Sequence, residues 1–284
     1  MSSDGKRVKG QGLVLLGARS DGQRPPRAAG AVWLVGAGPG DPELLTVRAL
    51  NVIRRAQVVV HDGLVPAAII DLAPAGARRI SVSKRKSRHA YPQEEINRML
   101  TAFALEGLTV VRLKGGDPFI FGRGGEELEA CRAAGVECHV VPGVTAALAA
   151  GASAGAPLTH RDAAQAVTFV TGHAKAGAAP DLDWPALARA NQTVVVYMGL
   201  SNAAAIAGQL IAHGRDGSTP ALIVESASLP GERRRVVTLA GLGEAAAGLD
   251  GPALLIIGEA MARATATDLI SLQLADVAVR GAIA

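Results

Sequence analysis

Residues 110–127 read VVRLKGGDPFIFGRGGEE. The first five form a mostly apolar run that is typical of a buried strand, and it ends in a glycine pair, Gly115-Gly116, followed by Asp117 and a proline. A loop with three more glycines then opens a helix whose first turn carries two glutamates. A ligand can lie directly on the backbone of a glycine pair. The stretch therefore predicts a strand, a binding loop and a helix rather than an ordinary turn.

The alternation of strand and helix patterns continues on both sides of this stretch. Short β-rich runs that alternate with helical segments are typical of parallel βαβ units. In the first half, the sequence predicts strands over 32–35, 58–61, 109–113 and 137–141, a short strand around Ile80, and helices over 44–55, 92–106 and 125–134. In the second half, it predicts strands over 167–170, 193–198, 220–225, 233–238 and 253–258, and helices over 184–190, 202–213 and 242–247.

The predicted fold class is α/β, with a mixed sheet in the second half. The loop 226–232 is short enough to join its two flanking strands as a hairpin, which places antiparallel strands in that sheet. Segment 151–157 is rich in small residues and ends in a proline, so a domain boundary is expected near it. We expect a flexible leader over 1–30, an N-terminal α/β domain over 31–155, a C-terminal α/β domain over 156–265 and a tail over 266–284.

The composition fits a soluble protein with a core of aliphatic side chains. Of the 284 residues, 49% are hydrophobic but only 3% are aromatic, and the formal net charge of +4 is too small for a nucleic-acid-binding footprint. Cys131 and Cys138 do not have metal-ligand spacing, so we interpret them as reduced thiols and expect no metal. No apolar run is long enough to span a membrane, which makes a cytoplasmic location the expectation.

The first predicted strand ends in GAGPGDP, residues 36–42, which is similar to a dinucleotide-binding turn. Asp41 stands where the third glycine of that fingerprint belongs, and its carboxylate would repel a pyrophosphate. Pro39 also lacks the N–H that a phosphate cradle uses. The turn thus favours a neutral or cationic ligand over a nicotinamide cofactor. An ordinary β–α turn is the alternative for this motif taken alone.

Charged residues follow other strands of the first half. Asp62 ends the second strand, at the edge where open α/β sheets place their sites, or it caps the next turn. The basic run 83–89 lies just beyond the strand around Ile80, so we expect it at the same edge; a solvated charged face is the alternative. His160 and Arg161 suit a carboxylate partner, or they form a surface pair.

Taken together, GAGPGDPELLT, VRLKGGDPFIFGRGGEE, VPGVTAA, PLTHRD, VTGH and VYMG, in this order, resemble the tetrapyrrole methylase superfamily and, within it, the uroporphyrinogen-III C-methyltransferases. The resemblance covers residues 31–261. It implies two α/β domains with a cleft between them, a homodimer, and S-adenosylmethionine-dependent C-methylation of uroporphyrinogen III at C2 and C7, which gives precorrin-2. We expect the monofunctional enzyme, because 30 residues before Ala31 cannot encode the dehydrogenase–chelatase module of sirohaem synthases.

The resemblance also implies roles for individual residues. Asp62 and Lys84 match the positions of the proton acceptor and the proton donor. The positions that hold S-adenosylmethionine correspond to Pro39, Gly115, Gly116, Asp117, Ile120, Thr145, Ala146, Met198, Ala227 and Ala253. The substrate has eight carboxylates, and the candidate clamps are Arg85, Lys86, Lys114, His160 and Arg161.

Two alternatives remain open at this stage. Another tetrapyrrole methylase, such as a later precorrin methyltransferase or the diphthine-forming enzyme, shares the GAGPGD-like opening but generally lacks the full LKGGDPFIFGRGGEE run. A non-catalytic module that senses adenosine compounds would not need Asp62 and Lys84 beside the ligand loop. We expect no nucleic-acid partner, and whether the product enters sirohaem or cobalamin synthesis is not encoded in these motifs.

Overall fold

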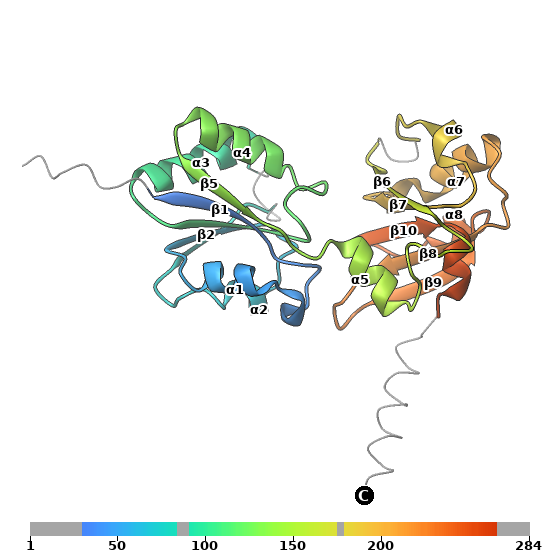
Figure 1. The fold of residues 1–284 in the computed structure, drawn as a ribbon, viewed down its shortest axis with the longest axis horizontal. Coiled ribbons are helices and arrows are strands. Elements are labelled where there is room, and N and C mark those ends of the chain that lie inside the picture. Colours follow the sequence, from blue (N-terminus) through green and yellow to red (C-terminus); the bar gives the residue numbers. More distant parts are fainter. Residues whose placement is uncertain (1–29, 84–90, 175–178, 266–284) are drawn as a thin grey trace, which may run out of the picture.

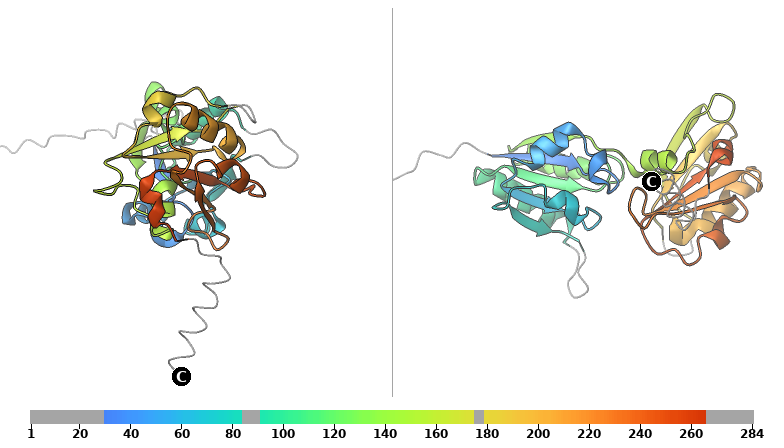
Figure 2. Two further views of the ribbon diagram at one scale, coloured as in Figure 1. Left: turned by 90° about the vertical axis from the view of Figure 1, so that its right-hand side faces the viewer. Right: turned by 90° about the horizontal axis from the view of Figure 1, so that it is seen from below.

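The computed structural model describes residues 30–83, 91–174 and 179–265. The predicted tail, all but the last residue of the predicted leader, and Lys84, Arg85 and Lys86 lie outside the described residues. The described chain forms two α/β lobes, each built around its own five-stranded sheet (Figures 1 and 2). This confirms the expected fold class of two α/β domains.

The first sheet is parallel throughout. Its strand order is β3-β2-β4-β1-β5, with bounds β1 Ala31–Gly36, β2 Val58–His61, β3 Arg78–Ser81, β4 Val110–Lys114 and β5 Glu137–Val141. One face is covered by α1 (Val47–Ile53) and α2 (Ala67–Ile70), and the other by α3 (Gln93–Leu105) and α4 (Gly124–Ala133) (Figure 1). Because the strands are parallel, all their carboxyl ends meet at one edge, where sites of open α/β sheets lie.

Strand β4 lies between β2 and β1, and all five of its residues are buried. Side chains alternate between the two faces of a strand. Val111 and Leu113 pack in the cluster that includes α1 and α2, while Val110 packs in the cluster of α3 and α4. Arg112 and Lys114 share the face of Val110, so two cations point into the layer of α3 and α4.

The second sheet is mixed, as expected. Its order is β6-β7-β10-β8-β9, with bounds β6 Ala166–Thr171, β7 Gln192–Tyr197, β8 Pro220–Glu225, β9 Arg233–Thr238 and β10 Ala253–Ile257. Only β6 and β7 pair in parallel, and β8 and β9 form the predicted antiparallel hairpin. One face packs against α6 (Trp184–Leu187), α7 (Ala203–Ala212) and α8 (Leu242–Ala245).

Helix α5 (Ala146–Ser153) covers the other face of the second sheet, together with the 3₁₀ helix η3 (Glu259–Arg263) (Figure 1). The inward residues Ala147, Ala150 and Ala154 contact the sheet in one apolar cluster, and their small side chains let the helix lie close to the strands. The expected boundary placed this helix in the first domain. Because α5 packs on the second sheet, we propose that the second domain begins at Ala146.

Helices differ more from the sequence expectations than strands do. The helix expected over 44–55 is divided into the 3₁₀ helix η1 (Pro42–Leu44) and α1, because Leu45 is extended. Thr46 then caps α1 by accepting a hydrogen bond from the Ala49 N–H, at 3.1 Å. The helix expected over 184–190 ends at Leu187, and the one-turn helices α2 and η2 (Leu200–Asn202) were not expected.

Candidate active site

Three loops at the carboxyl edge of the first sheet pack backbone to backbone. The loops after β1 and β4 are joined by a two-residue bridge, in which the Gly116 N–H donates to the Gly38 carbonyl at 2.7 Å and the Gly38 N–H donates back at 3.2 Å. A Cβ atom at Gly143, in the loop after β5, would stand 2.3 Å from the Gly116 carbonyl oxygen. Glycine is therefore required where the third loop meets the second.

Asp117 holds two of these loops together. Its Oδ1 accepts a hydrogen bond from the Phe119 N–H at 2.8 Å, and its Oδ2 accepts one from the Gly143 N–H at 3.0 Å. The sequence interpretation offered this carboxylate to a ligand's ammonium, hydroxyl or amide group. Both oxygens already have backbone donors, so the first role of Asp117 is to fix the shape of the loops.

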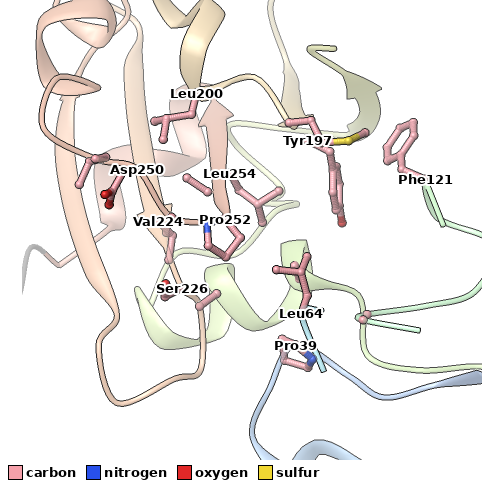
Figure 3. A pocket seen from close by; sticks show the side chains of 18 of the residues that line it. Pro39, Leu64, Phe121, Tyr197, Leu200, Val224, Ser226, Asp250, Pro252 and Leu254 are labelled. Atoms are coloured by element: carbon pink, nitrogen blue, oxygen red, sulfur yellow. The ribbon is translucent and has the colours of Figure 1, made fainter. Parts of the chain in front are cut away.

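A cavity of about 810 Å³ lies between the loops of the first sheet and the second lobe. In Figure 3, Pro39 and Leu64 from the first lobe lie across the cavity from Val224 and Pro252 of the second. The volume is in the range of sites for small molecules. All ten residues that the sequence assigned to the cofactor line this cavity: Pro39, Gly115, Gly116, Asp117, Ile120, Thr145, Ala146, Met198, Ala227 and Ala253. Their contacts with a cofactor stay a prediction.

The charges that line the cavity are all negative. Asp62, Asp117 and Asp250 contribute carboxylates, and none of the lining residues in the described part of the chain is Lys, Arg or His. The side chain of Asp250 is fully exposed at the far end of the cavity from Phe121 (Figure 3). Such a lining suits a ligand with a cationic centre, and it disfavours a polyanion inside the cavity.

Tyr197 connects the two lobes at the cavity wall, and sequence reasoning did not select it. Its hydroxyl is 2.6 Å from Thr145 Oγ1 and accepts a hydrogen bond from the Ala147 N–H at 3.2 Å. Phe121, from the loop after β4, packs on the tyrosine ring with centroids 5.0 Å apart. Burial raises the pKa of the Tyr197 hydroxyl, so it stays protonated. The sequence did offer a signal for Tyr197, since it is one of only two tyrosines in the chain and it ends an apolar strand.

Glu225 fixes the loop at the opposite wall and was also missed. Its side chain is almost fully buried, and its Oε1 accepts hydrogen bonds from the backbone N–H groups of Asp250 at 2.9 Å and Gly251 at 2.7 Å. Its Oε2 accepts from Arg233. Burial raises the pKa of Glu225, but the hydrogen bonds from Arg233 and the two N–H groups outweigh it and lower the pKa overall. The carboxylate thus shapes the segment that leads into Ala253.

Asp62 reaches the cavity from the end of β2 and is one-third exposed. Its Oδ1 accepts a hydrogen bond from Nη2 of Arg112, which is buried on the neighbouring strand β4. No residue that the structure describes donates a hydrogen bond to its Oδ2. The carboxylate thus lines the cavity, is held by Arg112, and accepts no hydrogen bond from the following turn among the described residues.

The structure corrects the role expected of Lys114. The side chain is only 2% exposed, and its ammonium group donates to Glu127 Oε1 at 3.0 Å. A strand residue that faces a helix layer cannot reach a substrate carboxylate in solvent, so Lys114 is not a clamp. His160 is half-buried and Arg161 is exposed, and neither lines the cavity.

No group of His, Cys, Asp and Glu that could hold a metal ion occurs in residues 30–83, 91–174 and 179–265. Cys131 and Cys138 are free thiols. Within the same ranges, no helix is both long and apolar enough to cross a membrane.

A model of the tetrapyrrole (corrin/porphyrin) methylases matches residues 31–243 of the sequence. The chain belongs to the tetrapyrrole methylase family. Among curated relatives of this chain, "Siroheme synthase 1" of Cronobacter sakazakii is 53% identical over 246 residues, which are 87% of this chain and 52% of that protein. The chain thus spans about half the length of the curated relatives it matches.

Solved structures of the family have the same two-domain fold. The uroporphyrin-III C-methyl transferase from Thermus thermophilus, complexed with S-adenosyl homocysteine, is 44% identical, with a TM-score of 0.71 over 82% of the chain described here and 99% of the solved one. A cobalt precorrin-4 methyltransferase is 28% identical, with a TM-score of 0.74 over 84% of the chain described here and 99% of the solved one. Both relatives fit the resemblance drawn from the sequence motifs.

Proposed function

We propose that this chain transfers methyl groups from S-adenosylmethionine to C2 and C7 of uroporphyrinogen III, giving precorrin-2 and S-adenosylhomocysteine. The observation that carries the proposal is the acid-lined cavity, in which every residue expected at the cofactor is gathered from two lobes. The 44% identity to a uroporphyrin-III C-methyl transferase, over nearly all of that protein, supports the same substrate.

The cavity fits S-adenosylmethionine by charge and by shape. The cofactor carries a sulfonium centre and an ammonium group, and the lining supplies three carboxylates and, among the described residues, no Lys, Arg or His. Small residues such as Gly115, Ala146 and Ala253 leave room for the adenosine and let it contact backbone groups. No metal is needed, because the donor is already activated.

S-Adenosylmethionine supplies a methyl group whose bond to sulfur breaks as a new carbon–carbon bond to the pyrrole forms. The protein's main task is to hold acceptor and donor in line, an effect worth roughly 7 kcal/mol or more. The loops after β1, β4 and β5 support that alignment, because the Gly38–Gly116 bridge and the two hydrogen bonds accepted by Asp117 hold them together. Leu64, Phe121 and Leu254 give the cavity apolar walls, which would be covered when a ligand binds (Figure 3).

The methylated ring is cationic and must lose a proton. Asp62 is the proposed acceptor, because its carboxylate lines the cavity with one oxygen held by Arg112. Lys84 is the proposed proton donor. General base and acid groups of this kind contribute about 10²–10⁴-fold to the rate.

The eight carboxylates of the substrate need cations, and the cavity lining offers none. We propose that they are bound outside the cavity, by the remaining clamp candidates Arg85, Lys86, His160 and Arg161. Homodimer formation and a cytoplasmic location are proposed with the function, as is a role in making the precursor of sirohaem or cobalamin.

Incubation with uroporphyrinogen III and methyl-labelled S-adenosylmethionine, followed by counting the methyl groups in the product, tests the proposal. Two methyl groups per tetrapyrrole are expected. Transfer only to a more highly methylated precorrin would indicate a later enzyme of the family. Binding of S-adenosylhomocysteine without any transfer would indicate a sensing module.

A further inference from the structure

Four charged side chains form a continuous network beneath the cavity. Glu127, fully buried in the first turn of α4, accepts from Nε of Arg112 at 2.9 Å and from Nζ of Lys114 at 3.0 Å. The same guanidinium uses Nη2 to hold Asp62 and Nη1 to donate to the Leu113 carbonyl at 3.1 Å. Arg112 therefore joins a fully buried carboxylate to the one that opens into the cavity.

The backbone dictates this arrangement. Arg112 and Lys114 are two residues apart on β4 and face the same helix layer. On α4 the buried residues are Gly124, Glu127 and Cys131, at helical spacing along one inward face. Glu127 is thus the acid that α4 presents to both cations, and its place in the first turn is favoured by the helix dipole.

Glu127 is the central hydrogen-bond acceptor of the network. Three donors, the third being Gln93 Nε2 at 3.3 Å, converge on its Oε1, and its buried Oε2 has no hydrogen-bond partner among the described residues. Burial, followed by the nearby Arg112, lowers the pKa of Lys114, while Glu127 and Asp62 act against this. Without the charge of Glu127, two buried cations would face one another.

Stability alone does not account for such a network. Replacing buried ion pairs by well-packed apolar side chains is often neutral or stabilising. A fixed guanidinium, by contrast, has a use at the cavity. Because Arg112 is held by Glu127 and by a backbone carbonyl, it can hold Asp62 in one orientation.

We propose that Glu127 is a positioning residue for methyl transfer, which acts through Arg112 to orient Asp62 toward the proton it accepts. In that step a C–H bond of the methylated cationic ring breaks, its electron pair restores the ring's conjugation, and the proton goes to the Asp62 carboxylate and later to solvent. Lys114 completes the charge balance of the network. The inference rests on the proposed function, and specifically on Asp62 as proton acceptor.

A double-mutant cycle on the full chain tests it. Glu127→Gln keeps the size of the side chain but removes its charge, and kcat should fall roughly 10- to 100-fold while the KM values for S-adenosylmethionine and uroporphyrinogen III change little. In an Asp62→Asn background, the same change should lower kcat no further, because the group that Glu127 acts through is already gone. A purely structural role would give additive losses.

Glu259→Gln is the matched control. Glu259 accepts from Nη2 of the buried Arg215 at 2.9 Å in the second lobe and does not line the cavity, so kcat should stay at the wild-type value. If Glu127→Gln does not fold, Glu127→Asp replaces it in the cycle, because it keeps the charge but its shorter side chain cannot hold all three donors on one oxygen.

The outcomes separate the two claims. If Asp62→Asn retains full turnover, Asp62 is not the proton acceptor, and the inference falls with that role. If Asp62→Asn loses turnover but Glu127→Gln does not, or if their effects add, the proposed function stands and the positioning role of Glu127 is overturned.

Discussion

Asp117→Ala should weaken cofactor binding through the shape of the loops. The substitution removes the acceptor for the Phe119 and Gly143 N–H groups and so detaches the loop after β4 from the loop after β5. A hydrogen bond to a charged group contributes about 1.5–3 kcal/mol. Asp117 is partly exposed, so the lower end applies to each bond, and losing both should cost about 3 kcal/mol.

If most of this free energy is lost from the loop conformation that binds the ligand, the affinity for S-adenosylhomocysteine should drop about 10²-fold. Isothermal titration calorimetry measures the loss directly. Asp216→Ala is the control, because Asp216 accepts from a backbone N–H two residues on, at 2.8 Å, but lies outside the cavity. Wild-type affinity in a folded Asp117→Ala protein would refute the reasoning.

Two further predictions concern the far wall of the cavity and the capture of substrate. The pKa of Glu225 is lowered in the folded state, so its contribution to stability is present above the unfolded value of about 4.3 and is lost as the pH falls through the folded value. In thermal denaturation, the melting temperature of the wild type should therefore fall more steeply with decreasing pH than that of Glu225→Gln. Equal pH dependence of the two melting temperatures would contradict this. Arg161→Ala should raise KM for uroporphyrinogen III with kcat unchanged, by less at high salt than at low salt. A salt-independent effect in steady-state kinetics, or one confined to kcat, would exclude a clamp.

Strand positions were predictable because the local pattern decides them. The runs expected over 58–61, 137–141, 220–225 and 233–238 each contain consecutive β-branched residues, and β2, β5, β8 and β9 have these same bounds. The ligand loops could also be placed, since parallel strands bring their carboxyl ends to one edge. Helix lengths were overestimated, because caps such as Thr46 restart the helix at a point that apolar periodicity does not mark.

Tertiary partners account for what the sequence did not predict. Lys114 was expected at the substrate, because nothing in the strand pattern shows that an acid 13 residues later turns inward beneath it. Glu225 and Tyr197 were missed for the same reason, since their partners at 250–251 and 145–147 come from distant segments. Most of the motif residues, in contrast, are small, and the glycine loops meet through backbone contacts.

The central claim is that the cavity between the two lobes holds the methyl donor. The most direct measurement is a crystal structure of the chain grown with saturating S-adenosylhomocysteine. The account predicts ligand density inside the cavity, in contact with Gly115 and Gly116 on one side and with Ala253 on the other. An empty cavity, or a nucleoside bound elsewhere on the protein, would contradict it.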